Sequence, residues 1–254
     1  MAAIALLFLS CTGRDGYVRI EGYAQGGTYS VIFNTEGVDK APTEIRDSVE
    51  AILKKIDHTL SGYNKNSVLS RFNAGENVVV DEMFAEIYSM GHEVWEETGG
   101  AVDVSSAPLY DMWGFGFKSG AFPSARQVDS VRSLCGMGLC RETISDLIGT
   151  DVEPESIYVG QHGSAYPRLN YNAIAQGYSC DLVARYLYSI GVRDMMVNIG
   201  EIFCDGKNPS GRSWTIGIDR PVDGNDLVGA DIHGIFRIPE GPCGVVTSGN
   251  YRKF

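Results

Sequence analysis

The stretch Leu169-Asn170-Tyr171-Asn172-Ala173-Ile174-Ala175-Gln176-Gly177-Tyr178-Ser179-Cys180-Asp181 joins a strand-like segment to the start of a helix. Small residues dominate the first turn of that helix. A helix N-terminus presents unpaired N–H groups and the positive end of the helix dipole, and both suit a phosphate group. The stretch therefore predicts a binding site for a diphosphate.

Helices are predicted on both sides of this junction. The helix that begins here covers residues 173–190, and apolar residues at helical spacing predict another over residues 44–60. Asp81 begins a third, which ends before Gly99-Gly100, and Ser124 caps a shorter one. The apolar face expected for residues 173–190 consists of Ile174, Tyr178, Leu182, Tyr186, Leu187 and Ile190.

Short strand-like runs make up most of the last third of the chain. They are separated by Gly, Pro and Asp, which favour turns. The expected strands cover residues 29–33, 195–199, 214–218, 234–238 and 244–247. Because helices and strands are mixed rather than strictly alternating, the sequence predicts an α+β fold with mainly antiparallel sheet. No repeat or long linker indicates a domain boundary.

Composition excludes several classes of protein. The chain has 254 residues, of which 44% are hydrophobic and 21% charged, and this is a globular mixture rather than a disordered one. Thirty-two acidic against 21 basic residues give a formal net charge of −11, which argues against nucleic acid as a partner. No apolar run approaches the roughly 20 residues of a transmembrane helix.

The N-terminus has the pattern of an export signal. Residues 2–10 are apolar and end in a small residue before Cys11, as in a bacterial lipoprotein signal. We expect a signal-like segment at residues 1–10, lipidation of Cys11 and a polar tether over residues 11–21, with the protein anchored on the periplasmic face of the cytoplasmic membrane. Because no Lys or Arg precedes Arg14, a hydrophobic first strand is the alternative. The cysteines show neither a CxxC pair nor zinc-ligand spacing, which favours buried, apolar roles.

Polar and aromatic clusters stand where the expected elements begin or end. Such loops carry functional groups on a rigid scaffold, although an ordinary turn or core packing explains each cluster singly. The clusters are Gln25-Gly26-Gly27-Thr28-Tyr29, residues 60–67 with Tyr63, residues 99–104 with Asp103, the aromatic and glycine-rich residues 111–117, and residues 246–251.

In this order the clusters resemble the ApbE family of FAD:protein FMN transferases, from about Gly22 to Phe254. The most specific matches are Leu60-Ser61-x-Tyr63 with Ser67 and Asn73, Gly100-Ala101-x-Asp103, Trp113-Gly114-Phe115-Gly116, residues 170–181, and Thr247-Ser248-Gly249-x-Tyr251. The resemblance implies the ApbE-like flavin transferase fold as a single domain over residues 22–254.

The resemblance also implies an enzyme. It would use magnesium to transfer the FMN moiety of FAD to a threonine or serine hydroxyl of an acceptor flavoprotein subunit, with release of AMP. By match to the family, the cofactor-binding residues are Gln25, Tyr63, Ala101, Val102, Asp103, Asn170 and Gln176, and the carbonyl of Ala173 binds the metal. No catalytic residue is assigned, because His58, His92, His162 and His233 are scattered.

The chain departs from the family pattern in several places. The family often has Met, Asp and Lys where this chain has Gln25, Asn170 and Gln176, and Asn198-Ile199-Gly200-Glu201 is one glycine short. The family also continues beyond the position of Phe254 with segments that complete its magnesium site, so we expect a C-terminally truncated domain. The alternatives are an FAD diphosphatase that yields FMN and AMP, a non-catalytic FAD-binding lipoprotein, or a solute-binding lipoprotein.

Overall fold

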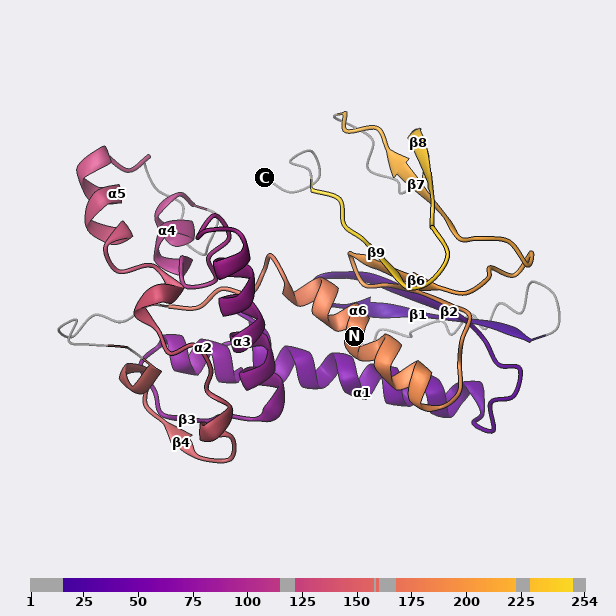
Figure 1. Ribbon diagram of the computed structural model, residues 1–254, viewed down its shortest axis with the longest axis horizontal. Coiled ribbons are helices and arrows are strands. Elements are labelled where there is room, and N and C mark those ends of the chain that lie inside the picture. Colours follow the sequence, from indigo (N-terminus) through magenta and orange to yellow (C-terminus); the bar gives the residue numbers. More distant parts are fainter. Residues whose placement is uncertain (1–15, 115–121, 158, 160–167, 223–228, 249–254) are drawn as a thin grey trace, which may run out of the picture. The chain divides into compact units, whose positions relative to one another are not determined.

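The computed structural model describes residues 16–114, 122–157, 159, 168–222 and 229–248 (Figure 1). Their contacts group into two compact units. The first unit comprises the chain up to Leu53 and from Gln176 onward, and the second comprises Lys54–Ala175. Cys11 and the signal-like segment lie outside the described residues, so their roles stay predictions.

A five-stranded antiparallel sheet forms the centre of the first unit, in the order β1-β2-β5-β6-β9. Its strands are β1 (Tyr17–Ala24), β2 (Gly27–Asn34), β5 (Met195–Asn198), β6 (Ile202–Asp205) and β9 (Cys243–Val245). The mixture of helices with antiparallel sheet confirms the expected fold class. β1 contains residues 17–21, which we expected to belong to the polar tether. Only Ile20 is buried among them, so the alternation of buried and exposed side chains is too weak to predict a strand.

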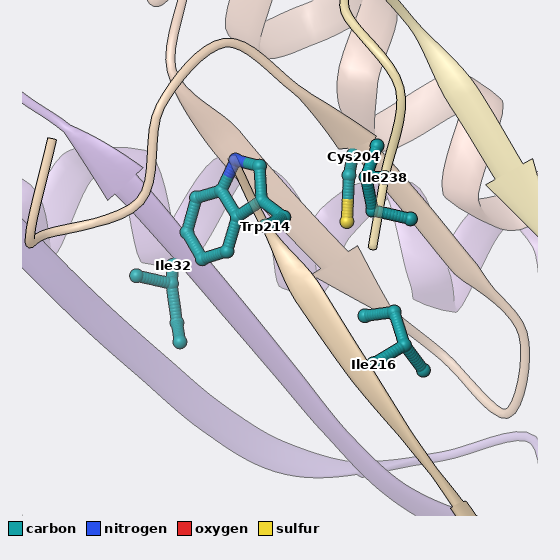
Figure 2. Close-up of a cluster of buried hydrophobic side chains, with 5 residues drawn as sticks. All are labelled: Ile32, Cys204, Trp214, Ile216 and Ile238. Atoms are coloured by element: carbon teal, nitrogen blue, oxygen red, sulfur yellow. The ribbon is translucent and has the colours of Figure 1, made fainter. Parts of the chain in front are cut away.

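The two faces of this sheet are buried by different elements. Figure 1 shows α6 (Ala175–Ser189) and the first part of α1 (Pro42–Leu60) along one side, and Val31, Phe33 and Val197 are fully buried. The segment with the hairpin of β7 (Thr215–Asp219) and β8 (Ile232–Arg237) packs against the other face. The buried cluster there consists of Ile32, Cys204, Trp214, Ile216 and Ile238 (Figure 2).

The second unit is mainly helical. Its elements are the end of α1, α2 (Val68–Asn73), α3 (Glu82–Glu97), α4 (Ala107–Met112), α5 (Ala125–Arg132), the strand pair β3 (Val78–Val79) and β4 (Asp151–Val152), and short 3-10 turns at Met137–Leu139, Ser145–Leu147 and Pro154–Ile157. In its core the ring of Phe84 packs against those of Phe72 and Tyr171, at centroid distances of 5.6 and 6.3 Å. Asp81 caps α3 and Ser124 caps α5, as the sequence predicts.

The stretch that begins at Leu169 differs from the expectation in two ways. The helix starts at Ala175 instead of Ala173, and residues 172–174 form a turn in which Ile174 donates its N–H to the carbonyl of Tyr171 at 2.9 Å, three residues before it. Its buried face is rotated: Val183 and Ala184 are buried, whereas Leu182 and Tyr186 are only half-buried. The preceding strand is reduced to a single bridge between Ser106 and Arg168.

No helix within the described ranges is long and apolar enough to cross a lipid bilayer.

Candidate functional site

A pocket of about 300 Å³ lies in the second unit, where several of the quoted motifs meet. The α1–α2 connection, α2, α4 and residues 168–172 form its walls. Its lining residues are Gly62, Tyr63, Leu69, Ser70, Asn73, Ala74, Ala107, Asp111, Arg168, Leu169, Asn170 and Asn172. Its size suits one part of a nucleotide-sized ligand.

Serine side chains hold the loop that carries Tyr63. The hydroxyl of Ser67 accepts a hydrogen bond from Ser70 N and so caps α2, and it donates to the carbonyl of Ser61 at 2.6 Å. The hydroxyl of Ser61 accepts the N–H of Tyr63 at 3.2 Å. The serine hydroxyls therefore hold the backbone of this loop. Tyr63, which is 70% exposed, lies on the pocket wall.

Asn73 connects α2 to the segment opposite. Its amide nitrogen donates to the carbonyl of Leu169 and its amide oxygen accepts the N–H of the same residue, both at 2.8 Å. The backbone of Asn170 donates to the carbonyl of Val104 at 2.7 Å. The backbone of residues 168–170 is thus held on two sides. These hydrogen bonds replace the ones that its N–H and carbonyl groups would make in a helix or sheet.

The charged side chains of the pocket form an ion pair. Arg168 and Asp111 approach to 2.9 Å, and their side chains are 40% and 26% exposed. Arg168 is the one positively charged residue among those that line the pocket. A guanidinium can bind a carboxylate and still present further N–H donors to a phosphate or a polar ring edge.

The segment with Ala101, Val102 and Asp103 does not line this pocket. One carboxylate oxygen of Asp103 accepts hydrogen bonds from both the backbone N–H and the hydroxyl of Ser105, at 2.8 and 2.7 Å. The Ser105 hydroxyl in turn accepts the N–H of Gly136 at 2.6 Å. In this structure Asp103 holds its own loop, and its assignment to FAD stays a prediction.

Gln25 and Gln176 belong to the first unit. Gln25 has a φ of 52° at the turn between β1 and β2, and its amide donates to the hydroxyl of Ser179. Ser179 follows Gln176 by one helical turn, so both glutamine side chains lie at the start of α6. Gly200 has a φ of +84° and packs directly against the Gln176 amide, so a side chain at position 200 would displace that amide.

The described residues do not form a magnesium site by themselves. Ala173 is exposed in the turn before α6, and its carbonyl would be a single oxygen ligand. Magnesium needs several oxygen ligands, normally with carboxylates among them. Within the described part of the chain, no three His, Cys, Asp or Glu side chains are grouped so that they could hold a metal ion.

The thiols near the motifs are not activated nucleophiles. Burial and the nearby Asp103 carboxylate raise the pKa of Cys135 to about 11. Burial raises the pKa of Cys180 to about 12. Both thiols are therefore protonated near neutral pH, and neither supplies the thiolate that covalent catalysis would need.

A family model described as "ApbE family" matches residues 25–254. The chain belongs to the ApbE family. The match begins at Gln25 and includes the pocket, the candidate residues of both units and the β7–β8 hairpin. It confirms the family to which the order of motifs points.

Similar proteins agree with this membership. The FAD:protein FMN transferase of Haemophilus influenzae is 29% identical over 99% of this chain and 71% of the relative. The flavin transferase ApbE of Vibrio cholerae has a TM-score of 0.70 and 27% identity over 94% of this chain and 73% of that one. The apo form of the Pseudomonas stutzeri flavinyl transferase ApbE has a TM-score of 0.68 and 30% identity over 84% of this chain and 66% of that one.

The structure adds site residues to those that the sequence assigned. Tyr63 and Asn170 line the pocket as candidates, whereas Asn73, Asp111 and Arg168 line it without having been assigned a role. Asn73 and Asp111 stand in quoted motifs, and Arg168 directly precedes the stretch that begins at Leu169. The sequence could have indicated these three residues only as charged or amide side chains within or next to a motif.

Proposed function

We propose that this chain is an FAD:protein FMN transferase. The observation that carries the proposal is the family match over residues 25–254, together with a pocket built from two of the family's motifs, Ser61 to Asn73 and the segment from Asn170. In the proposed reaction, the hydroxyl oxygen of a threonine or serine of the acceptor protein attacks the phosphorus of the FMN half. The diphosphate bond breaks, AMP leaves, and the hydroxyl loses its proton.

The pocket gives the proposal its binding chemistry. The exposed ring of Tyr63 offers a surface on which the isoalloxazine of FAD would stack. Asn170 carries an amide at the wall, and Arg168, while paired with Asp111, keeps further N–H donors for an anionic ligand. These donors matter because the formal net charge of the protein is −11, which by itself would repel an anionic ligand.

Magnesium dependence belongs to the proposal through the family resemblance. A divalent cation would neutralise charge on the diphosphate during transfer. The described residues hold no cluster of metal-binding side chains. The proposed roles of Tyr63 and Arg168 therefore do not depend on the metal. Activity with magnesium and after chelation measures this dependence separately.

The direct test is a transfer assay with this chain, FAD, magnesium and an acceptor subunit that carries a threonine. We expect the acceptor to gain the mass of FMN with one AMP released per transfer, as measured by intact mass spectrometry and nucleotide chromatography. An acceptor with that threonine changed to alanine is the matched control. Release of FMN and AMP without a modified acceptor would indicate a diphosphatase instead, and bound but uncleaved FAD would indicate a non-catalytic binding protein.

We also propose a lipid anchor at Cys11 that holds the protein on the periplasmic face of the cytoplasmic membrane. The support is the apolar run of residues 2–10 directly before Cys11. Cys11→Ser should move the protein from the membrane fraction to the soluble fraction and abolish incorporation of labelled fatty acid. Cys135→Ser, which keeps Cys11, should leave both unchanged. A Cys11→Ser protein that remained membrane-bound would contradict the anchor.

A further inference from the structure

Two cysteines face each other across adjacent strands of the first unit. Cys204 of β6 pairs directly with Cys243 of β9 in the antiparallel register. Residues paired in this way have Cα atoms about 4.5–5.5 Å apart, and disulfides span about 4.4–6.8 Å between Cα atoms. We propose that Cys204 and Cys243 are the site of an intramolecular disulfide bond that joins β9 to β6.

Both side chains lie on the same face of the sheet. Cys204 belongs to the buried cluster between the sheet and the β7–β8 hairpin (Figure 2), and Cys243 packs against that cluster. The next pair on this face, Ile202 with Val245, packs against the same cluster. The strands are therefore already held in register, and the bond needs side-chain rotation rather than a change of pairing.

The two thiols differ in access to solvent. Cys204 is fully buried, whereas Cys243 is partly exposed on the last strand of the sheet order. A soluble oxidant therefore reaches Cys243 first. Burial, with the nearby thiols of Cys243 and Cys180, raises the pKa of Cys204 to about 12, so bond closure should become faster as the pH rises.

A disulfide oxidant such as oxidised glutathione gives a balanced reaction. The thiolate of Cys243 attacks one sulfur of the oxidant and expels one glutathione thiolate. Cys204 then loses its proton, and its sulfur attacks Sγ of Cys243 in the mixed disulfide and expels the second glutathione. The two protein thiols lose two electrons and two protons, and the oxidant disulfide is reduced to two thiols.

The bond would stabilise the hairpin side of this unit. It closes a loop over residues 205–242, which contains the β7–β8 hairpin and ends at β9. Closing a loop of this length restricts the unfolded chain, and we expect the thermal midpoint to rise by roughly 5–15 °C. The effect does not depend on the proposed transferase activity.

The test uses the purified full chain in native buffer at about pH 8. After oxidised glutathione, alkylation of free thiols and digestion, mass spectrometry should find a peptide pair linked through Cys204 and Cys243. The thermal midpoint should rise on oxidation and return on reduction. Cys243→Ser should remove both effects with little change in the reduced fold, because its side chain is partly exposed. Cys135→Ser, the other partly exposed thiol among the described cysteines, should keep both.

Three results would overturn the proposal. The first is that both thiols are alkylated after oxidation of the folded protein. The second is that Cys243 remains only a mixed disulfide with glutathione, and the third is that Cys204 is linked to a different cysteine. Each is read from the same peptide map, which also separates Cys11 from the other thiols.

Discussion

Replacing Tyr63 with alanine should weaken FAD binding by about tenfold to a hundredfold, because stacking of a planar ring on an aromatic side chain contributes about 1–3 kcal/mol. Tyr63 is 70% exposed and lines the pocket. Its loop is held by the hydroxyls of Ser61 and Ser67 acting on backbone groups, so the substitution should leave the fold intact. Titration of flavin fluorescence against protein measures the affinity.

Two variants separate stacking from other causes. Tyr63→Phe keeps the ring and should retain most of the affinity. Tyr110→Ala removes a tyrosine from α4 that is 41% exposed and does not line the pocket, and it should have no effect. If Tyr63→Ala bound FAD as tightly as the parent protein, the flavin would lie elsewhere and the pocket would have a different ligand.

The helices were the most predictable part of the fold, for a local reason. Asp81 and Ser124 are capping residues whose hydrogen-bond partners lie three positions away. Both partners of each bond can therefore be recognised in a short stretch of sequence. The short β6 was missed because its four residues, flanked by Gly200 and Gly206, carry too little pattern for detection. Its place in the sheet comes from pairing with β5, which ends at Asn198, and with β9, which begins only at Cys243.

The start of α6 shows how tertiary contacts override a periodic pattern. Ala173 and Ile174 continue the apolar spacing of the helix, yet they lie in a turn in which the carbonyl of the buried Tyr171 accepts the N–H of Ile174. Tyr171 is buried in part against Phe84, a residue of α3. The spacing of apolar residues within one segment cannot predict a contact with another helix.

The residues of the candidate site also differ in how far the sequence predicts them. Tyr63 and Asn170 could be chosen from the sequence because each stands inside a motif. The pairing of Arg168 with Asp111 could not, since the two residues are far apart in sequence and are brought together by long-range contacts such as the hydrogen bond from Ala107 N to the Arg168 carbonyl. Residues that position others are therefore harder to predict than residues that face a ligand.

Asn73 is such a positioning residue, and Asn73→Ala should lower the free energy of unfolding by about 2–4 kcal/mol. The substitution leaves the N–H and the carbonyl of Leu169 without partners, and Leu169 is only 1% exposed. Unpaired buried polar groups cost about 1–3 kcal/mol each. Urea unfolding followed by tryptophan fluorescence gives the change. Asn77→Ala, at an exposed asparagine whose amide makes a 3.5 Å contact with Glu153, should stay within about 0.5 kcal/mol.

The pH dependence of Asn73→Asp tests whether the two hydrogen bonds cause the loss. At pH 7 a carboxylate would accept the N–H of Leu169 but repel its carbonyl, whereas a protonated carboxyl can donate to that carbonyl. Burial beside a carbonyl raises the pKa of the new carboxyl above its unfolded value. The folded state then binds the proton more tightly, so the stability of Asn73→Asp relative to the parent should rise as the pH falls from 7 towards 5. A deficit that does not change with pH would mean that packing around Asn73, rather than its link to Leu169, holds the pocket wall.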